Sequence, residues 1–510
     1  MHMFTVKDHR KWTVFLVTFL VSLLACVSCG SGEGGSSSPE SRNSGESTGA
    51  ESSQSSPDNS NKTKLVYLIP SRNELDESTV EGINEALDQQ GAPYFIEFQA
   101  LSWSDSDPSI YGAEVREHMG SADLLFTGWP GSDYPALARE NRLLCLDEYL
   151  TSEEGKRLYE SLPADNWYAI TIGESVYGVT GYPYAANTPP SYTANQELME
   201  KYKISEADLS KPLYELEDVI RRVYEGERGR DGFAPVRVSR SACDRFCGEY
   251  YISSSVTLNE ETGEAHLLLE NLEYVKWLEA LFDFYRKGYV DGSDHGVIED
   301  QFLSVHFSTN IPTELAADGR YEINGDVSGK AKDIAVEGYT GYSGKLYFAT
   351  AVSAETANQE YALDFLTRLF TDSHLTNLMI LGAGYESELD SDGRRNPGTL
   401  ADNYMAYGNY YISAPSHYDY VDMKDKYFEF HNSLKRSSFT GFCFDSMPVE
   451  EQMDSADLVF SAFLGELFST DQDFDTYLAE CRQQLLEAGA QEVIEEANRQ
   501  FTAFKTGNGS

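Results

Sequence analysis

The residues in this sequence that are best suited to chemistry are aromatic and polar side chains gathered in one loop. The segment 128–134 reads Gly-Trp-Pro-Gly-Ser-Asp-Tyr and follows an apolar run. Trp129 and Tyr134 present flat apolar faces, while the carboxylate of Asp133 accepts hydrogen bonds. A loop of this kind suits the noncovalent binding of a small solute better than it suits bond breaking.

Motifs that would support catalysis or a metal site are missing from the sequence. It has no HExxH pair, no nucleophile elbow and no phosphate-binding loop, and its 9 histidines show no zinc-ligand spacing. The 83 acidic residues supply so many carboxylate pairs that none can be singled out as glycosidase catalysts. We therefore expect a protein that is not an enzyme and that uses neither a metal ion nor a cofactor.

The elements expected around the aromatic loop alternate between strands and helices. Apolar runs at 65–70, 94–101 and 121–128 predict strands, and the periodicity of 78–90 predicts a helix between the first two. This order is typical of an α/β lobe. Ligands of open α/β sheets bind beyond the carboxyl ends of the strands, and the loop 128–134 has that position.

Helical periodicity dominates the later part of the chain. We expect the region after Val449 to be almost entirely helical, and we expect Trp277 and Cys145 to lie in the core because their neighbours are apolar. The segments with one apolar face are 211–225, 272–287, 360–370, 458–468, 474–488 and 491–503.

The composition limits the class of protein further. The chain has 510 residues and a net charge of −44, which does not suit binding to a phosphate backbone, so we expect no nucleic-acid partner. Hydrophobic residues make up 41% and aromatic residues 13%, which excludes a wholly disordered chain. The length fits either a bilobal protein or several smaller domains.

Residues 1–25 resemble a bacterial export signal. A basic start is followed by an uncharged apolar run over 12–25, which is shorter than the about 20 residues of a membrane-spanning helix. The run ends at a cysteine, as in the lipobox of bacterial lipoproteins. Cys26 fits that pattern better because Leu23 stands three positions before it, and Cys29 is the alternative. Lipid on either cysteine would hold the protein at a membrane surface.

Residues 26–64 are expected to form a disordered tether. From Gly30 to Lys64 the chain lacks Leu, Ile, Val, Met and aromatic residues, so it cannot build a core. A coil of this length spans on the order of 30 Å.

Later in the chain, Cys243 and Cys247 stand four positions apart, and an exported protein could oxidise them. Two free thiols on one helical face explain the spacing equally well.

Several short segments, in order, resemble the extracellular solute-binding proteins, family 1, of bacterial ABC importers, in particular the lipoproteins of Gram-positive bacteria. Residues 121–128 resemble a "DI-x-FTG" strand, and residues 441–445 resemble a "GF-x-FD" signature. The other segments that carry the resemblance are 143–150, 167–179, 349–378, 408–410, 448–449, 488–489 and 498–500. The sequence departs from the family pattern at 179–183 and 381–386.

The resemblance implies a fold class and a domain organisation. The expected fold is α/β, two-lobed and periplasmic-binding-protein-like (type II), with a hinge and a helical C-terminal part. It would occupy residues 65–506, with lobe 1 at about 65–178 plus part of 330–400. Lobe 2 would comprise about 180–325 and much of the C-terminal helical region.

The resemblance also implies partners and a location. It implies capture of a small solute by lobe closure and delivery to the transmembrane subunits of an ABC permease. We expect a monomer that is lipid-anchored at the extracellular face of the cytoplasmic membrane, in a Gram-positive bacterium. Two other functions remain open, namely a surface-anchored glycan-active enzyme and a sensor lipoprotein without a transport role.

Aromatic and amide side chains near the segments that are expected to connect the two lobes complete the candidate site. Carbohydrates combine apolar ring faces with hydroxyl groups, and therefore need aromatic platforms and hydrogen-bonding side chains. We expect a sugar or oligosaccharide as the ligand. The candidates are Trp129, Asp133, Tyr134, Tyr182, Tyr184, Asn187, Tyr339, Tyr342 and Tyr385.

Overall fold

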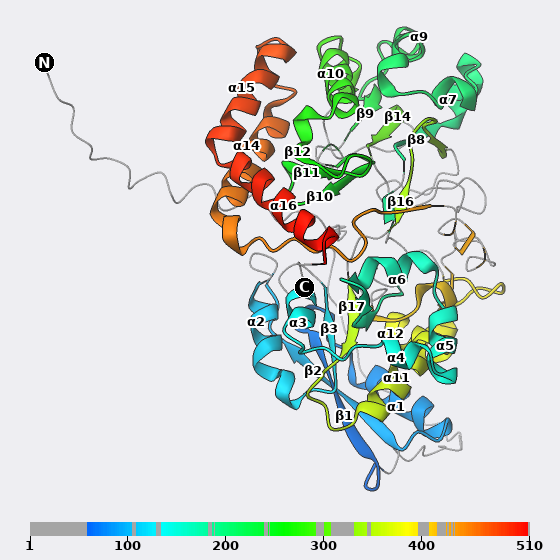
Figure 1. The fold of residues 1–510 in the computed structure, drawn as a ribbon. Coiled ribbons are helices and arrows are strands. Elements are labelled where there is room, and N and C mark those ends of the chain that lie inside the picture. The colour runs from blue at the N-terminus through cyan, green and yellow to red at the C-terminus, as the bar shows by residue number, and fades with distance from the viewer. Residues whose placement is uncertain are drawn as a thin grey trace, which may run out of the picture.

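The protein consists of two lobes, which lie one above the other in the computed structural model (Figure 1). The predicted signal, Cys26, Cys29 and residues 26–58 of the predicted tether lie outside the described residues. Residues 59–64 of the predicted tether are described, and Thr63 and Lys64 already belong to strand β1 (Thr63–Pro70). In the part of the chain that is described, no helix is both long and apolar enough to cross a membrane. The structure describes residues 59–104, 109–128, 134–181, 186–187, 189–238, 243, 245–291, 300–307, 331–343, 348–395, 407–415, 425, 428–429, 432 and 434–507.

Lobe 1 is built on a five-stranded sheet of order β2-β1-β3-β17-β6. Strands β1 (Thr63–Pro70), β2 (Tyr94–Leu101) and β3 (Leu124–Thr127) are parallel, as the alternation of predicted strands and helices indicated. Strands β17 (Ala349–Val352) and β6 (Gly178–Val179) complete the sheet. Strand β17 runs antiparallel to both of its neighbours.

Helices cover both sides of this sheet (Figure 1). Helix α1 begins at Glu77, one residue before the predicted start, because the Asp76 carboxylate accepts a hydrogen bond from the backbone N–H of Thr79 at 2.8 Å. The helices of this lobe are α1 (Glu77–Gln89), α2 (Ser109–His118), α3 (Tyr134–Arg139), α4 (Asp147–Leu150), α5 (Glu153–Glu160), α6 (Ala164–Ile170), α11 (Gln359–Thr371) and α12 (Ser373–Leu381).

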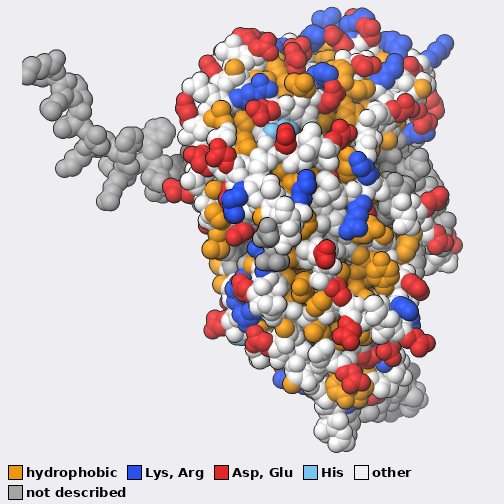
Figure 2. Space-filling model, viewed as in Figure 1, with side chains coloured by type: hydrophobic (Ala, Val, Ile, Leu, Met, Phe, Trp, Pro, Cys, Tyr) orange, Lys and Arg blue, Asp and Glu red, His pale blue; other side chains and the backbone are white. Residues whose placement is uncertain are grey.

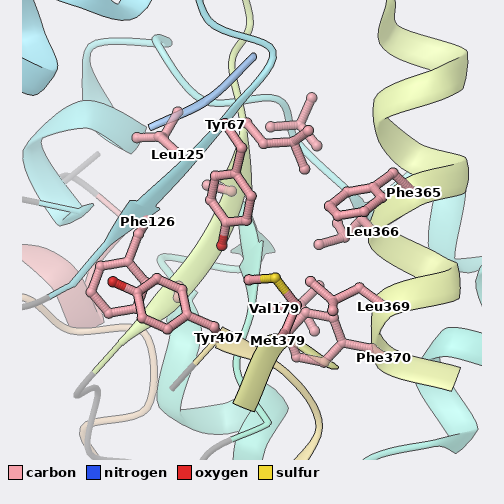
Figure 3. Close-up of a cluster of buried hydrophobic side chains, with 14 of the residues drawn as sticks. Tyr67, Leu125, Phe126, Val179, Phe365, Leu366, Leu369, Phe370, Met379 and Tyr407 are labelled. Carbon is pink, nitrogen blue, oxygen red and sulfur yellow. The ribbon is translucent and has the colours of Figure 1, made fainter. Parts of the chain in front are cut away.

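The core of lobe 1 joins segments that are far apart in the sequence (Figure 3). Tyr67 from β1 is fully buried, and its hydroxyl forms a 2.7 Å hydrogen bond with the hydroxyl of Thr350 in β17. Phe126 from β3 packs against Tyr407 with ring centroids 4.5 Å apart. These contacts show why the segment that returns at Ala349 belongs to the first lobe.

Lobe 2 has a second five-stranded sheet of order β13-β9-β14-β8-β15. Strands β13, β9 and β14 are parallel to one another, while β8 is antiparallel to both of its neighbours. The fully buried Trp277 lies in the core beside this sheet, as predicted. The strands are β8 (Ser191–Asn195), β9 (Ala234–Arg237), β13 (Val290–Asp291), β14 (Gln301–His306) and β15 (Ala331–Ala335).

Helices and a small antiparallel sheet surround the second core. The helices are α7 (Gln196–Tyr202), α8 (Glu206–Leu209), α9 (Glu217–Glu227) and α10 (Leu272–Arg286), and the sheet contains β10 (Glu249–Tyr251), β11 (Val256–Asn259) and β12 (Ala265–Leu267). The helix predicted from residue 211 begins six residues later, at Glu217. Pro212 is extended, and Leu213–Glu215 form a separate 3-10 turn before the helix.

The C-terminal region is helical, as predicted. Helices α14 (Glu450–Glu466) and α15 (Phe474–Glu487) extend the core of lobe 2. Helix α16 (Ala490–Lys505) packs its Phe501 against Phe439 and Phe442, with ring centroids 4.5 and 5.3 Å apart. The large core of lobe 2 and a small core around Phe439 and Phe442 therefore meet at this helix.

The cysteines differ in environment. Cys243, Cys247 and Cys481 are buried, and the structure contains no disulfide between the first two. The prediction that Cys145 lies in the core was wrong, because its side chain is exposed. Its neighbours Leu143 and Leu146 are buried, and the cysteine between them faces outward.

Three segments that connect the lobes pair with one another. Strands β7 (Ala186–Asn187), β16 (Tyr342–Ser343) and β18 (Lys435–Arg436) form a three-stranded sheet of order β18-β16-β7. Strand β7 lies on the way from β6 to β8, and β16 lies on the way from β15 to β17. Strand β18 precedes the C-terminal helices. Because each strand belongs to a different connection, the sheet joins the connections into one hinge element.

Backbone contacts attach the connection that contains β18 to lobe 1. The amide of Gly173 donates a 2.7 Å hydrogen bond to the carbonyl of Gly441, and Gly441 has a φ of +85°. A Cβ atom on Gly441 would lie 2.1 Å from the Gly173 carbonyl oxygen. A similar approach occurs at Gly181, where a Cβ atom would lie 2.2 Å from the Gly408 carbonyl oxygen. Both sites therefore require glycine.

The Gly441→Ala substitution should destabilise the protein more than a positive φ alone can explain. The matched control is Gly338→Ala, because Gly338 has a φ of +90° and a Cβ atom there would meet nothing within 4 Å. We expect a cost of about 1 kcal/mol for the control and on the order of 3 kcal/mol for Gly441→Ala in urea unfolding. Equal costs for the two variants would contradict the close approach.

Candidate functional site

The carboxyl ends of the parallel strands in both sheets face the boundary between the lobes. In lobe 1, the start of β17 at Ala349 pairs with Thr127 at the end of β3, and the chain reaches Ala349 from the hinge sheet. In lobe 2, the start of β8 at Ser191 pairs with His306 at the end of β14. The chain reaches Ser191 from strand β7 of the hinge sheet. Ligands of α/β sheets bind at such carboxyl ends, so the lobe boundary is the candidate ligand site.

The first predicted binding loop follows β3, whose carboxyl end faces this boundary. Strand β3 ends at Thr127, and Gly128 follows with a φ of +88°. This positive φ turns the chain out of the sheet toward the loop that carries Trp129 and Asp133. Trp129 and Asp133 themselves lie outside the described residues. Tyr182 and Tyr184, which follow Gly181 in the first connection, also lie outside them.

Tyr134 is placed in the core of lobe 1. It is fully buried at the start of α3, its hydroxyl donates a 2.8 Å hydrogen bond to the carbonyl of Ile170, and it accepts one from the amide of Tyr177. Burial raises the pKa of the Tyr134 phenol. In this position the ring anchors the start of α3 in the core and has no surface to offer to a solute.

Two of the predicted residues meet in the hinge sheet. Asn187 in β7 is the register partner of Tyr342 in β16. Tyr342 is buried, and the ammonium group of Lys435 in β18 lies 5.2 Å from the centroid of its ring. This contact is a cation–π interaction between two connections. The sequence pattern identified both residues, but their pairing comes from the fold.

The remaining predicted residues lie in separate lobes. Tyr339 packs in lobe 2, where its hydroxyl accepts a 2.9 Å hydrogen bond from the indole N–H of Trp277. Tyr385 follows α12 in lobe 1, is buried, and bonds through its hydroxyl to Nδ1 of His374 at 3.0 Å. Burial raises the pKa of both phenols. The structure therefore does not bring these two tyrosines together.

The ends of three strands in lobe 2 carry polar groups that the sequence did not single out. Arg237 at the end of β9 forms a 2.9 Å ion pair with Asp291 at the end of β13. His306 at the end of β14 lies 3.3 Å from the hydroxyl of Thr193, and burial lowers the pKa of its imidazole to about 4. His306 is therefore neutral at pH 7. No sequence signal pairs such strand ends, because the neighbour order of the strands depends on the fold.

Residues 435–445, here called the strap, are held by both lobes. The guanidinium of Arg436 lies 4.4 Å from the ring centroid of Tyr168 in α6 of lobe 1. On the side of lobe 2, the buried carboxylate of Glu260 accepts hydrogen bonds from the hydroxyl of Ser437 at 2.7 Å and the amide of Ser438 at 3.1 Å. The strap is therefore in contact with both lobes.

The surface charge is mixed on the face shown in Figure 2, where acidic side chains are spread over both lobes with lysines and arginines among them. Within the described residues, no group of three or more His, Cys, Asp or Glu side chains is placed to hold a metal ion.

Comparison with known families adds one sequence match. Residues 438–506 match a family described as a domain of unknown function, DUF3502. The matched region contains most of the strap and helices α14 to α16. No curated protein matches the chain in sequence.

Solved structures of transport proteins match most of the chain. The N-glycan transport solute binding protein NgtS from Streptococcus pneumoniae is 18% identical, and the match covers 87% of this chain and 99% of that chain with a TM-score of 0.62. The structure of NgtS in complex with Man1GlcNAc, also 18% identical with the same coverage, has a TM-score of 0.57.

An HMO-binding, ABC-transporter-associated solute binding protein from Bifidobacterium longum infantis is also similar. It is 13% identical, and the match covers 87% of this chain and 99% of that chain with a TM-score of 0.56. These matches confirm the predicted fold: the chain has the two-lobed α/β fold of extracellular solute-binding proteins.

The contact between Glu260 and the strap should make stability depend on pH. Burial raises the pKa of Glu260, against the hydrogen bonds from Ser437 and Ser438 that lower it. A carboxyl whose folded pKa lies above its unfolded pKa stabilises the fold most at low pH, and this contribution is lost as pH rises through the folded pKa. We therefore expect the unfolding free energy of the parent, relative to Glu260→Gln, to fall between pH 4 and pH 8. A difference that stays constant or rises would contradict the burial of this carboxylate.

Proposed function

We propose that the protein is a solute-binding lipoprotein of an ABC importer that captures an oligosaccharide between its two lobes. The observation that carries this proposal is that the carboxyl edges of both sheets face one boundary, crossed by a hinge sheet of paired connections. Closure of such lobes about a hinge surrounds a solute and excludes water. The aromatic residues predicted near the boundary suit the apolar faces of sugar rings.

The similarity to carbohydrate-binding transport proteins supports the ligand class. NgtS was solved with Man1GlcNAc, and the Bifidobacterium protein is described as HMO-binding. Our chain shares their fold over most of its length. Loops vary more between proteins of one fold than the elements that they connect. We therefore propose the class of ligand, an oligosaccharide, and assign its specificity to the loops at the strand ends.

The proposal includes a location and partners. A lipid on Cys26, with Cys29 as the alternative, would anchor the protein to the outer face of the cytoplasmic membrane, and residues 26–64 would tether the folded part to it. The captured solute would pass to a permease, and the protein would act as a monomer without catalysis or a cofactor. Mass spectrometry of the mature N-terminus tests the anchor: a lipid on neither cysteine would remove this part of the proposal.

Calorimetric titration with oligosaccharides, N-glycan fragments included, tests the ligand class. We expect saturable binding, and we expect Trp129→Ala to weaken it about tenfold or more, because a buried aromatic platform supplies a large share of the binding free energy. The matched control is Tyr159→Ala, because Tyr159 is an exposed aromatic residue of lobe 1 that lies on α5.

Three results would count against this part of the account. Failure of every oligosaccharide to bind would contradict the ligand class. Binding that Trp129→Ala leaves unchanged would remove Trp129 from the site. Cleavage of the added oligosaccharide by the protein would instead favour the glycan-active enzyme.

A further inference from the structure

Two cations in the hinge sheet carry charge that no carboxylate pairs with at close range. Lys435 and Arg436 form strand β18, and both side chains are exposed. Among the described residues, neither forms an ion pair within contact distance, and Arg436 also has no hydrogen bond. The guanidinium of Arg436 is therefore available to an acidic group from outside the protein.

An aromatic ring holds the guanidinium of Arg436 without using its hydrogen-bond donors. The guanidinium carbon lies 4.4 Å from the ring centroid of Tyr168 in α6, and Tyr168 is itself partly exposed. A guanidinium over the face of a ring is attracted by the ring's π electrons. Its N–H groups lie in its own plane, so they stay available for a planar anion.

The two cations belong to the sheet that crosses the lobe boundary. Lys435 is in register with Tyr342, and Tyr342 is in register with Asn187, so β18 extends the sheet that contains two residues predicted for the ligand site. Arg436 reaches α6 of lobe 1, while the next residue of the strap bonds to Glu260 of lobe 2. Figure 1 shows β16 where the two lobes meet. An anion on Arg436 would therefore lie at this boundary.

The charge near the boundary is balanced at other cations but not at Arg436. Burial raises the pKa of Glu260, and Lys435 lies close enough to oppose that shift, so part of the charge of Lys435 is balanced within the protein. Arg237 at the end of β9 pairs with Asp291 at 2.9 Å. The acidic residues elsewhere in the chain act weakly on Arg436, because physiological salt screens charges beyond about 8 Å.

We infer that Arg436, assisted by Lys435, binds a carboxylate of the solute, so that the protein prefers acidic oligosaccharides such as sialylated ones. This inference rests on the proposed function, because it places one end of the ligand that the lobes capture. The planar guanidinium donates two parallel hydrogen bonds to a carboxylate, whereas a neutral sugar leaves its charge to water. Because Arg436 is exposed, water screens the ion pair, and we expect a severalfold preference.

Calorimetric titration of the folded protein with sialyllactose, with its methyl ester and with lactose tests this inference. The ester has nearly the shape of the acid but not its charge. We expect the acid to bind about fivefold more tightly than the ester, and we expect Arg436→Gln to remove this preference without weakening the ester. A purely structural role of Arg436 would weaken both sugars alike. Arg436→Lys keeps the charge without the planar fork and should retain part of the preference.

The matched control is Arg286→Gln, which should keep the preference. Arg286 is exposed at the end of α10, away from the hinge sheet, and its guanidinium lies 4.2 Å from the ring centroid of Phe282, so the variant removes the same unit of charge.

The inference is overturned if the acid and the ester bind the parent equally, a comparison that needs no variant. It is also overturned if Arg436→Gln, shown by circular dichroism to be folded, keeps the preference. If sialyllactose does not bind but neutral oligosaccharides do, the inference fails and the proposed function stands. If no oligosaccharide binds, both fail.

Discussion

The pairing of three lobe-to-lobe connections in one small sheet is the constraint on which the rest of the structure depends. Strands β7, β16 and β18 are short, but β16 pairs with both of the others, and β18 also contacts the ring of Tyr342 in β16 and the ring of Tyr168 in lobe 1. Close backbone approaches at Gly441 and Gly181 leave no room for side chains. Together these contacts limit how the lobes can move, because a rotation must pass through the same paired segments.

The hinge sheet also determines where the candidate ligand site lies. Each five-stranded sheet turns its carboxyl edge toward the hinge, so strand ends of both lobes face one boundary. The polar groups at the strand ends of lobe 2 already have partners, as in the pair of the buried Arg237 with the partly exposed Asp291. In the proposed function, the loops would therefore supply the groups of lobe 2 that recognise the solute.

The sequence predicted the local elements well and the contacts between them poorly. Helices with a clear apolar face, such as α10 and α11, begin and end within one residue of the predicted bounds, because periodicity and end signals are local properties. Tyr134 shows where prediction from the sequence fails. Its residue type and its place beside Trp129 suggested a solute contact, but the start of α3 turns its ring into the core. Cys145 fails for the same reason, since an apolar neighbourhood in sequence does not fix which side chain points inward.

The central claim is that the lobes close on an oligosaccharide, and small-angle X-ray scattering tests it most directly. Each lobe has its own core, so closure would not require either lobe to unfold. The account predicts a smaller radius of gyration with a saturating oligosaccharide than without it, at unchanged molecular mass. A radius of gyration that stays the same when calorimetry shows the ligand bound would contradict closure as the mechanism of capture.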